Sequence, residues 1–166
     1  MGHPIMDIHI RQFISSDKEF IESLIPRFSE FDLPVWRQRN EIDDTNSASL
    51  KKAMEEPEPD SAIFIAEDET GNRAGFIHLQ VQIDYFNSER VGYISDLAVT
   101  MSFEGRGVGG MLINKAEEWA LKNNCRMLSL YVFSNNTKAR RVYEKLGFQE
   151  EVSKYVKPLT SSNNKE

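Results

Sequence analysis

Hydrophobic positions follow two different periods along the chain, and these periods predict a mixed α/β protein. Alternation of apolar and polar residues predicts strands at 7–13, 62–67, 74–84, 91–99 and 127–133. Apolar residues at helical spacing predict a helix after a capping box at Ser16 and Glu19, a short helix at 47–56, a long helix after the glycines near 107, and a helix at 138–146. Residues 31–44 show no clear period and are predicted to be a loop or a broken helix. A last strand is expected at 149–156.

This order of elements defines the expected fold class. It predicts an α/β (α+β) domain with a single mixed sheet flanked by helices. The 166 residues show no internal repeat and no second domain. We therefore expect one domain over residues 1–159, followed by a polar, frayed tail at 160–166.

Composition excludes several classes of protein. The chain is 40% hydrophobic and 28% charged, as is usual for a globular domain, and no apolar run approaches the ~18 residues of a membrane span. A single cysteine, Cys125, excludes an internal disulfide, and the amino terminus lacks a secretory signal pattern. A net charge of −6 argues against nucleic-acid binding. We expect a cytoplasmic protein without membrane or nucleic-acid partners.

The candidate chemistry begins where the strand at 91–99 ends. Four glycines follow, and an amphipathic helix pattern starts among them: Gly105, Gly107, Gly109 and Gly110. The first N–H groups of a helix have no intrahelical partner and lie at the positive end of its dipole. Glycines let such a backbone approach a phosphate closely. The segment therefore predicts a phosphate cradle.

Two common phosphate-binding motifs fit this cradle poorly. A P-loop requires Lys and Ser or Thr after its last glycine, but Met111 and Leu112 follow Gly110. A dinucleotide fingerprint matches the glycine spacing, but the next strand ends without the acidic residue that binds the ribose. The glycines also start several residues beyond the strand.

A third pattern is closer, because two motifs occur in the right order with the right gap. The chain reads Leu97-Ala98-Val99, a short link, and then Glu104-Gly105-Arg106-Gly107-Val108-Gly109. About 25 residues on come Asn136, a helix with Tyr143, and Gly147-Phe148. This arrangement resembles the GNAT N-acetyltransferases over roughly residues 91–148.

The resemblance implies that acetyl-CoA is the cosubstrate. Its binding residues would be Leu97, Ala98, Val99, Glu104, Gly105, Arg106, Gly107, Val108, Gly109, Gly110 and Asn136. Glu104 departs from the family, which usually has Arg or Gln there. We expect it to point to solvent while Arg106 supplies the cation. The alternative role of Asn136 is to cap the following helix.

The resemblance also implies the fold and the reaction. The strands at 91–99 and 127–133 would splay apart, and the pantetheine arm would bind between them like an added strand. The enzyme would transfer the acetyl group directly to a primary amine in a ternary complex. The alternative is an acyl-CoA-binding sensor or interaction module without turnover. Dimerisation is common in the family, so a homodimer is one expected state.

The candidate catalytic residues are Tyr143 and Asp96. Tyr143 occupies the position of the family's general acid, where its phenol would assist the departing thiolate; its alternative role is packing. Asp96, on the strand before the cradle, is the candidate base; its alternative is a hydrogen-bonded structural carboxylate. By alternation, Tyr93 and Ser95 would lie on the opposite face from Asp96. His78 is interpreted mainly as a structural histidine.

The expected acceptor is a small amine. The histidines form no metal pattern, and no metal is expected. Four carboxylates in segments expected near the acceptor cleft favour a cationic, even polycationic, acceptor: Asp43, Asp44, Asp84 and Glu89.

Overall fold

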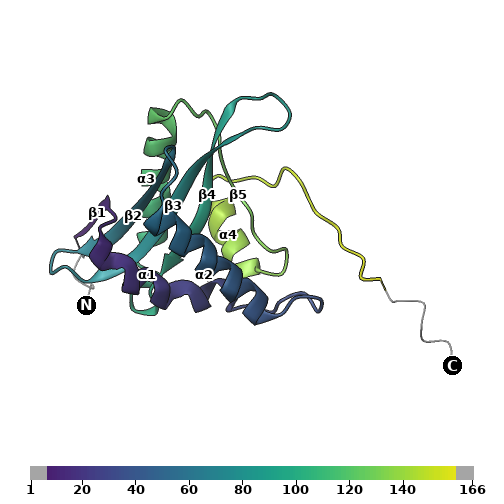
Figure 1. The fold of residues 1–166 in the computed structure, drawn as a ribbon, viewed down its shortest axis with the longest axis horizontal. Helices are drawn as coiled ribbons and strands as arrows, with labels where there is room; N and C mark the ends of the chain where they lie inside the picture. The colour runs from purple at the N-terminus through teal and green to yellow at the C-terminus, as the bar shows by residue number, and fades with distance from the viewer. Residues whose placement is uncertain (1–6, 160–166) are drawn as a thin grey trace.

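The computed structural model describes residues 7–159, which form a five-stranded sheet with helices on both faces (Figure 1). The strands lie in chain order: β1 (Ile8–Gln12), β2 (Ser61–Asp68), β3 (Arg73–Ile83), β4 (Arg90–Val99) and β5 (Leu128–Leu130). β1 to β4 pair antiparallel, and β5 pairs parallel to β4. The expected mixed sheet is confirmed. The tail predicted at 160–166 lies outside the described residues.

Four α-helices and three 3-10 turns connect and cover the strands. They are η1 (Ser15–Asp17), α1 (Lys18–Leu24), η2 (Ile25–Ser29), α2 (Arg39–Glu55), η3 (Met101–Phe103), α3 (Val108–Lys122) and α4 (Thr137–Lys145). α1 and α2 cover the face nearer the viewer in Figure 1, and α3 covers the opposite face.

Each face of the sheet has its own apolar core, because successive strand residues point to opposite sides. On the α3 face, Ile77 and Leu79 pack with Leu112. On the other face, Phe76 packs with Ile21 of α1 and Leu50 of α2. The sheet therefore holds a helix layer on each side, and the glycine segment joins the end of β4 to the start of α3.

The start of α2 differs from the prediction. The helix begins at Arg39, inside the segment expected to be a loop or a broken helix and eight residues before the start predicted at 47. Its first turn is capped by the Glu41 carboxylate, which accepts the N–H of Gln38 at 2.9 Å. Only Leu50 of this helix is fully buried, so apolar spacing gives little signal for its first half.

The two predictions at the carboxyl end of the chain also need correction. β5 is three residues long, shorter than the predicted strand at 127–133. The strand predicted at 149–156 is wrong for the single chain, since residues 149–159 form no helix or strand and are exposed. This tail leaves the body after α4 and lies against no strand edge (Figure 1).

Candidate active site

The glycine segment forms an open cradle at the amino end of α3. Gly105 and Gly107 have φ of 72° and 81°, and Gly107 is the N-cap of the helix. Side chains rarely adopt this left-handed backbone, which explains why glycine is needed at both positions. A Cβ added to either residue would meet nothing within 4 Å. The space before the helix is therefore open, as a group approaching the helical N–H groups requires.

The next two glycines let the helix sit close to its neighbours. A Cβ on Gly109 would lie 4.0 Å from the Val99 side chain, and one on Gly110 would lie 3.7 Å from the Leu146 side chain. The first turn of α3 thus rests between the end of β4 and the end of α4. This packing fixes the cradle relative to both elements.

Glu104 is exposed, and its carboxylate also has two ionic partners. Its carboxylate is paired with the Arg27 guanidinium from η2 and with the Lys138 ammonium from α4, the latter at 3.3 Å. Partial burial raises the pKa of Glu104, but Lys138 and Arg27 outweigh it, so the pKa lies below its ordinary value. The carboxylate is therefore ionised, and two cations stand beside the cradle.

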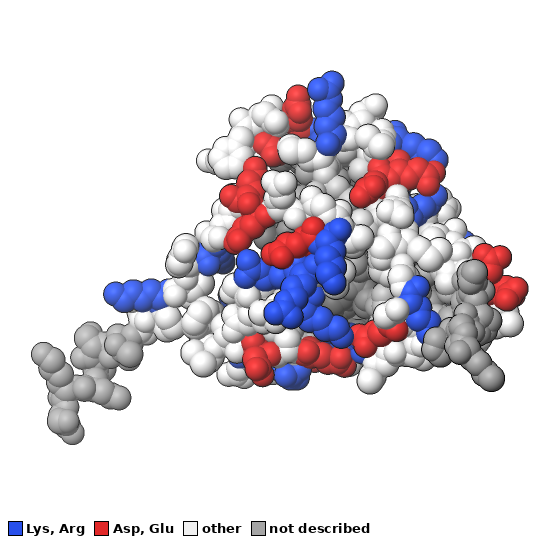
Figure 2. Space-filling model, turned by 180° about the vertical axis from the view of Figure 1, so that it is seen from behind, with Lys and Arg blue, Asp and Glu red and all other residues white. Residues whose placement is uncertain are grey.

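Further basic side chains lie in the same region. The Arg106 guanidinium stands 5.5 Å from the centre of the Phe103 ring, a cation–π contact that holds it at the loop. α4 adds Lys138 and Arg140 in its first turns. Figure 2 shows lysine and arginine side chains gathered around a hollow on one face of the molecule. These cations suit an anionic ligand.

β4 and β5 stop pairing before β4 reaches the cradle. The two strands pair only from Gly92 with Leu128 to Ile94 with Leu130. On its other edge β4 stays paired with β3 as far as Val99. The residues from Ser95 to Val99 therefore have no strand partner on the β5 side in the described part of the chain. This is the divergence expected of the two strands, and it includes Leu97, Ala98 and Val99.

Tyr143 lies on α4, half-buried against the α3-side core. Its ring meets the Phe148 ring edge-on, with 5.7 Å between centroids. Burial raises the pKa of Tyr143 above its ordinary value. The phenol is therefore protonated near neutral pH and can donate a hydrogen bond or a proton. Its catalytic role stays a prediction.

Asn136 caps α4. Its side-chain oxygen accepts the N–H of Ala139 at 3.2 Å, which is the capping role considered for it from the sequence. The side-chain amide N–H groups are not used by this contact, so a second hydrogen bond to a ligand is compatible with the cap.

A β-bulge changes the faces predicted for β4. β3 pairs His78 with Asp96 but the next residue, Leu79, with Ile94, so Ser95 is the extra residue. Tyr93 pairs with Gln80 and therefore shares the face of His78 and Asp96. The alternation that placed Tyr93 and Ser95 opposite Asp96 is wrong, because a bulge restarts it.

Asp96 is buried and bound to a histidine that the sequence did not assign to the site. His78 Nδ1 lies 2.8 Å from Asp96 Oδ2, and the two side chains are only 2% and 7% exposed. His78 also lines a cavity of about 190 Å³ between α2, β2 and β3. The remaining lining residues are largely polar: Ser49, Lys52, Ala53, Glu56, Glu58, Ser61 and Gln80.

Two of the carboxylates assigned to the acceptor cleft have local partners. Asp84 accepts the N–H groups of Phe86 and Asn87 in the turn after β3. Asp43 accepts the Ser29 hydroxyl at 2.7 Å. Asp84 therefore stabilises the turn after β3, and Asp43 links α2 to η2. The carboxylates that line the cavity, Glu56 and Glu58, were not picked out by the sequence, because nothing in their spacing marks them.

The chain belongs to the acetyltransferase (GNAT) family, whose model matches residues 19–148. It is 33% identical over 144 residues to an uncharacterised N-acetyltransferase of Bacillus subtilis (strain 168), covering 87% of this chain and 91% of that protein. It is 29% identical over 111 residues to the aminoglycoside N(6')-acetyltransferase type 1 of Salmonella typhimurium, covering 65% and 74%.

A solved structure gives the same assignment. The aminoglycoside N-acetyltransferase AAC(6')-Iy in complex with CoA is 26% identical, with a TM-score of 0.69 over 93% of this chain and 97% of that chain. The protein is thus an acetyl-CoA-dependent N-acetyltransferase. The resemblance, the cosubstrate and the enzyme class predicted from the sequence are confirmed.

Residues 7–159 also lack the features of two other classes of protein. No helix among them is long and apolar enough to cross a membrane. The same residues hold no group of three or more His, Cys, Asp or Glu side chains placed to bind a metal ion.

Proposed function

We propose that the enzyme transfers the acetyl group of acetyl-CoA directly to a primary amine of a small cationic acceptor, with both substrates bound at once. The observation that carries this proposal is the unpaired edge of β4 from Ser95 to Val99, which runs into the cradle at Gly107. An extended amide-bearing arm fits such an edge as an added strand does. A pyrophosphate fits the helix end at the same time.

The residues at the end of β4, in the cradle and at the start of α4 would each bind a different portion of acetyl-CoA. Leu97, Ala98 and Val99 offer unpaired backbone groups to the pantetheine arm. The cradle from Glu104 to Gly110 offers its backbone N–H groups to the phosphates, with Arg106 and Lys138 as nearby cations. Asn136 offers its side-chain amide. Acetyl-CoA supplies an activated acetyl group on a thioester.

Tyr143 is proposed as the proton donor. When the C–N bond to the amine forms and the C–S bond breaks, the sulfur leaves as a thiolate that needs a proton. The phenol is protonated because burial raises its pKa. A thiol is the more acidic group, so a hydrogen bond that tightens as charge develops on sulfur is a sufficient role.

His78 is proposed as the group that receives the amine's proton, and Asp96 as the residue that positions it. Asp96 was the base expected from the sequence, but its Oδ2 is already engaged by His78 Nδ1 at 2.8 Å. That bond leaves the other ring nitrogen for the cavity that His78 lines. The Asp96 side chain would orient the ring and stabilise the imidazolium that forms, as in a His–Asp pair.

This assignment is tested by replacing His78 with Gln. At neutral pH kcat should fall by about 10²-fold, since a positioned base contributes roughly that factor. Affinity for acetyl-CoA should not change, and Asp96→Asn should reproduce part of the loss. The matched control is His9→Gln, which removes the other histidine–carboxylate pair, His9 with Glu67 at 2.8 Å. Normal turnover in His78→Gln would contradict the proposal.

The acceptor is proposed to be an amine with more than one positive charge. Glu56 and Glu58 line the cavity beside His78, and hydroxyl and amide groups of Ser61 and Gln80 add hydrogen-bonding partners. The relative that acetylates aminoglycosides supports this class. Carboxylates attract a cation but stabilise its ammonium form. Turnover should therefore rise with pH as the free amine appears.

A panel of amines scored by CoA release tests the acceptor class. We expect polyamines and amino sugars to be acetylated and KM for them to rise with ionic strength. Activity confined to neutral or acidic acceptors would contradict the electrostatic part. Acetyl-CoA binding without turnover on any amine would favour the acyl-CoA-binding module instead.

A further inference from the structure

The cavity beside His78 carries charges of both signs on its α2 wall. Lys52 and Glu56 line it from α2, near the carboxyl end of the helix. Residues four apart on a helix lie about one turn apart on the same face, so these two side chains are neighbours. Glu58 lines the cavity from the segment that follows the helix. The wall therefore presents a cation next to an anion.

These charges are not used by the contacts of the protein itself. Within residues 7–159, Lys52, Glu56 and Glu58 form no ion pair and no side-chain hydrogen bond. The charges of α3 behave differently, since Lys122 pairs with Glu118 at 2.7 Å. The order of the residues explains part of this contrast, because glutamate before lysine is the better order for a pair four residues apart, and α2 has the reverse.

A free cation and a free anion one helical turn apart suit the two charges of an amino acid. The carboxylate would accept hydrogen bonds from the Lys52 ammonium, and the α-ammonium would donate to the Glu56 carboxylate. Hydrogen bonds between charged groups are stronger than those between neutral ones. The volume agrees, because about 190 Å³ is small beside the ~300–1,000 Å³ of a typical ligand pocket. A polyamine would leave Lys52 facing like charges.

We propose that the acceptor is a diamino carboxylic acid, such as lysine or ornithine, held at one end by Lys52 and Glu56 so that its side-chain amine reaches His78. This rests on the proposed function and narrows it, since the acceptor keeps two amines and gains an anionic group. The side-chain nitrogen forms a C–N bond to the acetyl carbonyl carbon, and the C–S bond of acetyl-CoA breaks. The amine's proton passes to His78, and the thiolate takes the proton that Tyr143 donates.

Matched acceptors that differ only in the carboxylate test this class. Lysine is compared with cadaverine, and ornithine with putrescine. KM should be about tenfold lower for the amino acid of each pair, because a hydrogen bond between charged groups contributes roughly that factor. The product should carry the acetyl group on the side-chain nitrogen, which fragmentation mass spectrometry identifies. Equal KM values, or acetylation of the α-amine, would overturn the proposal.

Substitution of Lys52 should act with opposite sign on the two kinds of acceptor. Lys52→Met should raise KM for lysine about tenfold. It should lower KM for cadaverine, because a repelling charge is removed. Glu56→Gln should raise KM for both. The matched control is Lys51→Met, an exposed lysine outside the cavity lining, which should change either KM by less than about twofold. A change of the same sign and size for both acceptors in Lys52→Met would contradict the assignment.

Binding to the complex with CoA separates this proposal from the proposed function. Without an acetyl group no reaction follows, so calorimetry gives the affinities of lysine and cadaverine alone. Tighter binding of lysine that is lost in Lys52→Met would uphold the amino-acid site even in a protein that turned over no amine. Turnover of diamines without any preference for the carboxylate, in KM or in affinity, would uphold the transferase reaction and overturn the amino-acid site.

Discussion

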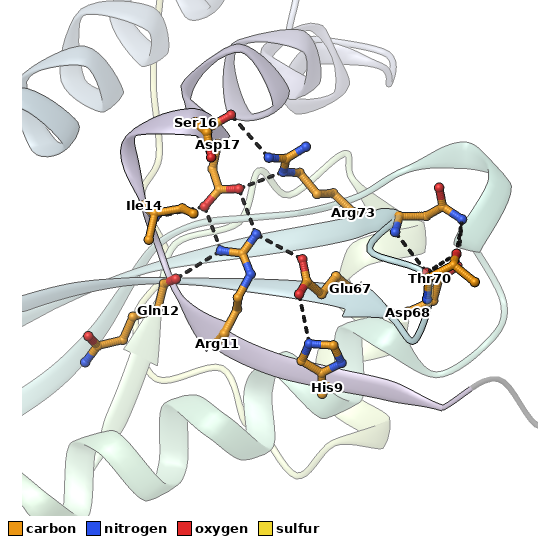
Figure 3. A network of polar contacts seen from close by, with 11 residues as sticks. His9, Arg11, Gln12, Ile14, Ser16, Asp17, Glu67, Asp68, Thr70 and Arg73 are labelled. Atoms are coloured by element: carbon orange, nitrogen blue, oxygen red, sulfur yellow. Dashed lines mark hydrogen bonds and ion pairs between the residues drawn. The ribbon is translucent and has the colours of Figure 1, made fainter.

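The two edges of the sheet are built in opposite ways. At the β1 edge, ion pairs and hydrogen bonds tie the strand to its surroundings (Figure 3). Arg11 binds both oxygens of the buried Asp17 carboxylate at 2.8 and 2.9 Å and also binds Glu67 at 2.9 Å. Arg73 adds a contact to Asp17 at 2.6 Å. On the β5 side, by contrast, the described residues from Ser95 to Val99 of β4 have no partner on β5, and the rings of Tyr131 and Phe133 are exposed.

This difference predicts that the β1 edge contributes mainly to stability and the β5 side mainly to function. At the β1 edge the side-chain contacts serve to hold the strand in place, so changes there should alter the free energy of unfolding and leave catalysis intact. On the β5 side, the backbone groups of β4 from Ser95 to Val99 are not paired by β5 and are the proposed binding site of the acetyl-CoA arm. Changes there should alter binding and turnover more than folding.

The largest effect is expected at Tyr143, on the β5 side. Tyr143→Phe removes the hydroxyl and keeps the ring against Phe148. If the phenol assists the thiolate, kcat should fall about 10²-fold. Steady-state kinetics on a good acceptor measure this, and the melting temperature should stay close to that of the wild type. Wild-type kcat in the variant would make Tyr143 a packing residue.

The corresponding change on the β1 side is Asp17→Asn. It leaves Arg11 and Arg73 without their carboxylate, and breaking such a buried contact should cost about 2–3 kcal/mol of unfolding free energy. Urea unfolding measures the loss. kcat and KM at 25 °C should equal those of the wild type. A large loss of activity in a folded variant would contradict the claim that the β1 edge contributes to stability and not to catalysis.

Two glycine substitutions, compared with each other, separate the effect of filling the cradle from the effect of general backbone strain. Gly107→Val should weaken acetyl-CoA binding at least tenfold, or about 1.4 kcal/mol, because a side chain fills the open cradle. Gly71, in the turn after β2, also has positive φ at 84° and open space around its Cβ position. Gly71→Val should therefore cost similar stability and leave affinity unchanged. Calorimetry with acetyl-CoA measures both, and equal affinities in the two variants would contradict the cradle.

The smallest effect is a pH dependence of stability at the β1 edge. Burial raises the pKa of Asp17, but Arg11, the Ile14 N–H and Arg73 outweigh it and lower the pKa from 3.8 to about 2. The unfolded chain therefore takes up the proton at a higher pH than the folded one. The stabilisation is complete above about pH 4 and is lost as the pH falls toward 2. Unfolding curves between pH 2 and 6 should show this slope, and Asp17→Asn should reduce it.

The sequence was informative where local rules decide the structure. Glycine spacing and the end of a strand located the cradle, and strand alternation located β1 to β4. The first helical segment was expected to start with Ser16 and Glu19, yet Asp17 accepts the Ile14 N–H instead. Asp17 is held by Arg11 of the preceding strand and by Arg73 of β3, 56 residues further on, and such a long-range contact leaves no local pattern.

The same reason explains what was missed at the site. His78 joins Asp96 only because a bulge at Ser95 shifts the register, and no residue type in β4 announces a bulge. The strand at 149–156 was expected on composition, but a strand also needs an edge to pair with. In the described single chain, no strand edge pairs with residues 149–156.

The ion pairs of Glu104 have a consequence for the end of the catalytic cycle. A loop that offered every nearby cation to the pyrophosphate would also hold the product CoA tightly, and product release often limits turnover. Glu104 shares the charge of Arg27 and Lys138 with any phosphate that arrives. If CoA binds at the cradle as proposed, the carboxylate would compete with its phosphates for these two cations and shorten the residence time of the product. Glu104→Gln should bind CoA more tightly, release it more slowly in stopped-flow measurements, and show stronger product inhibition.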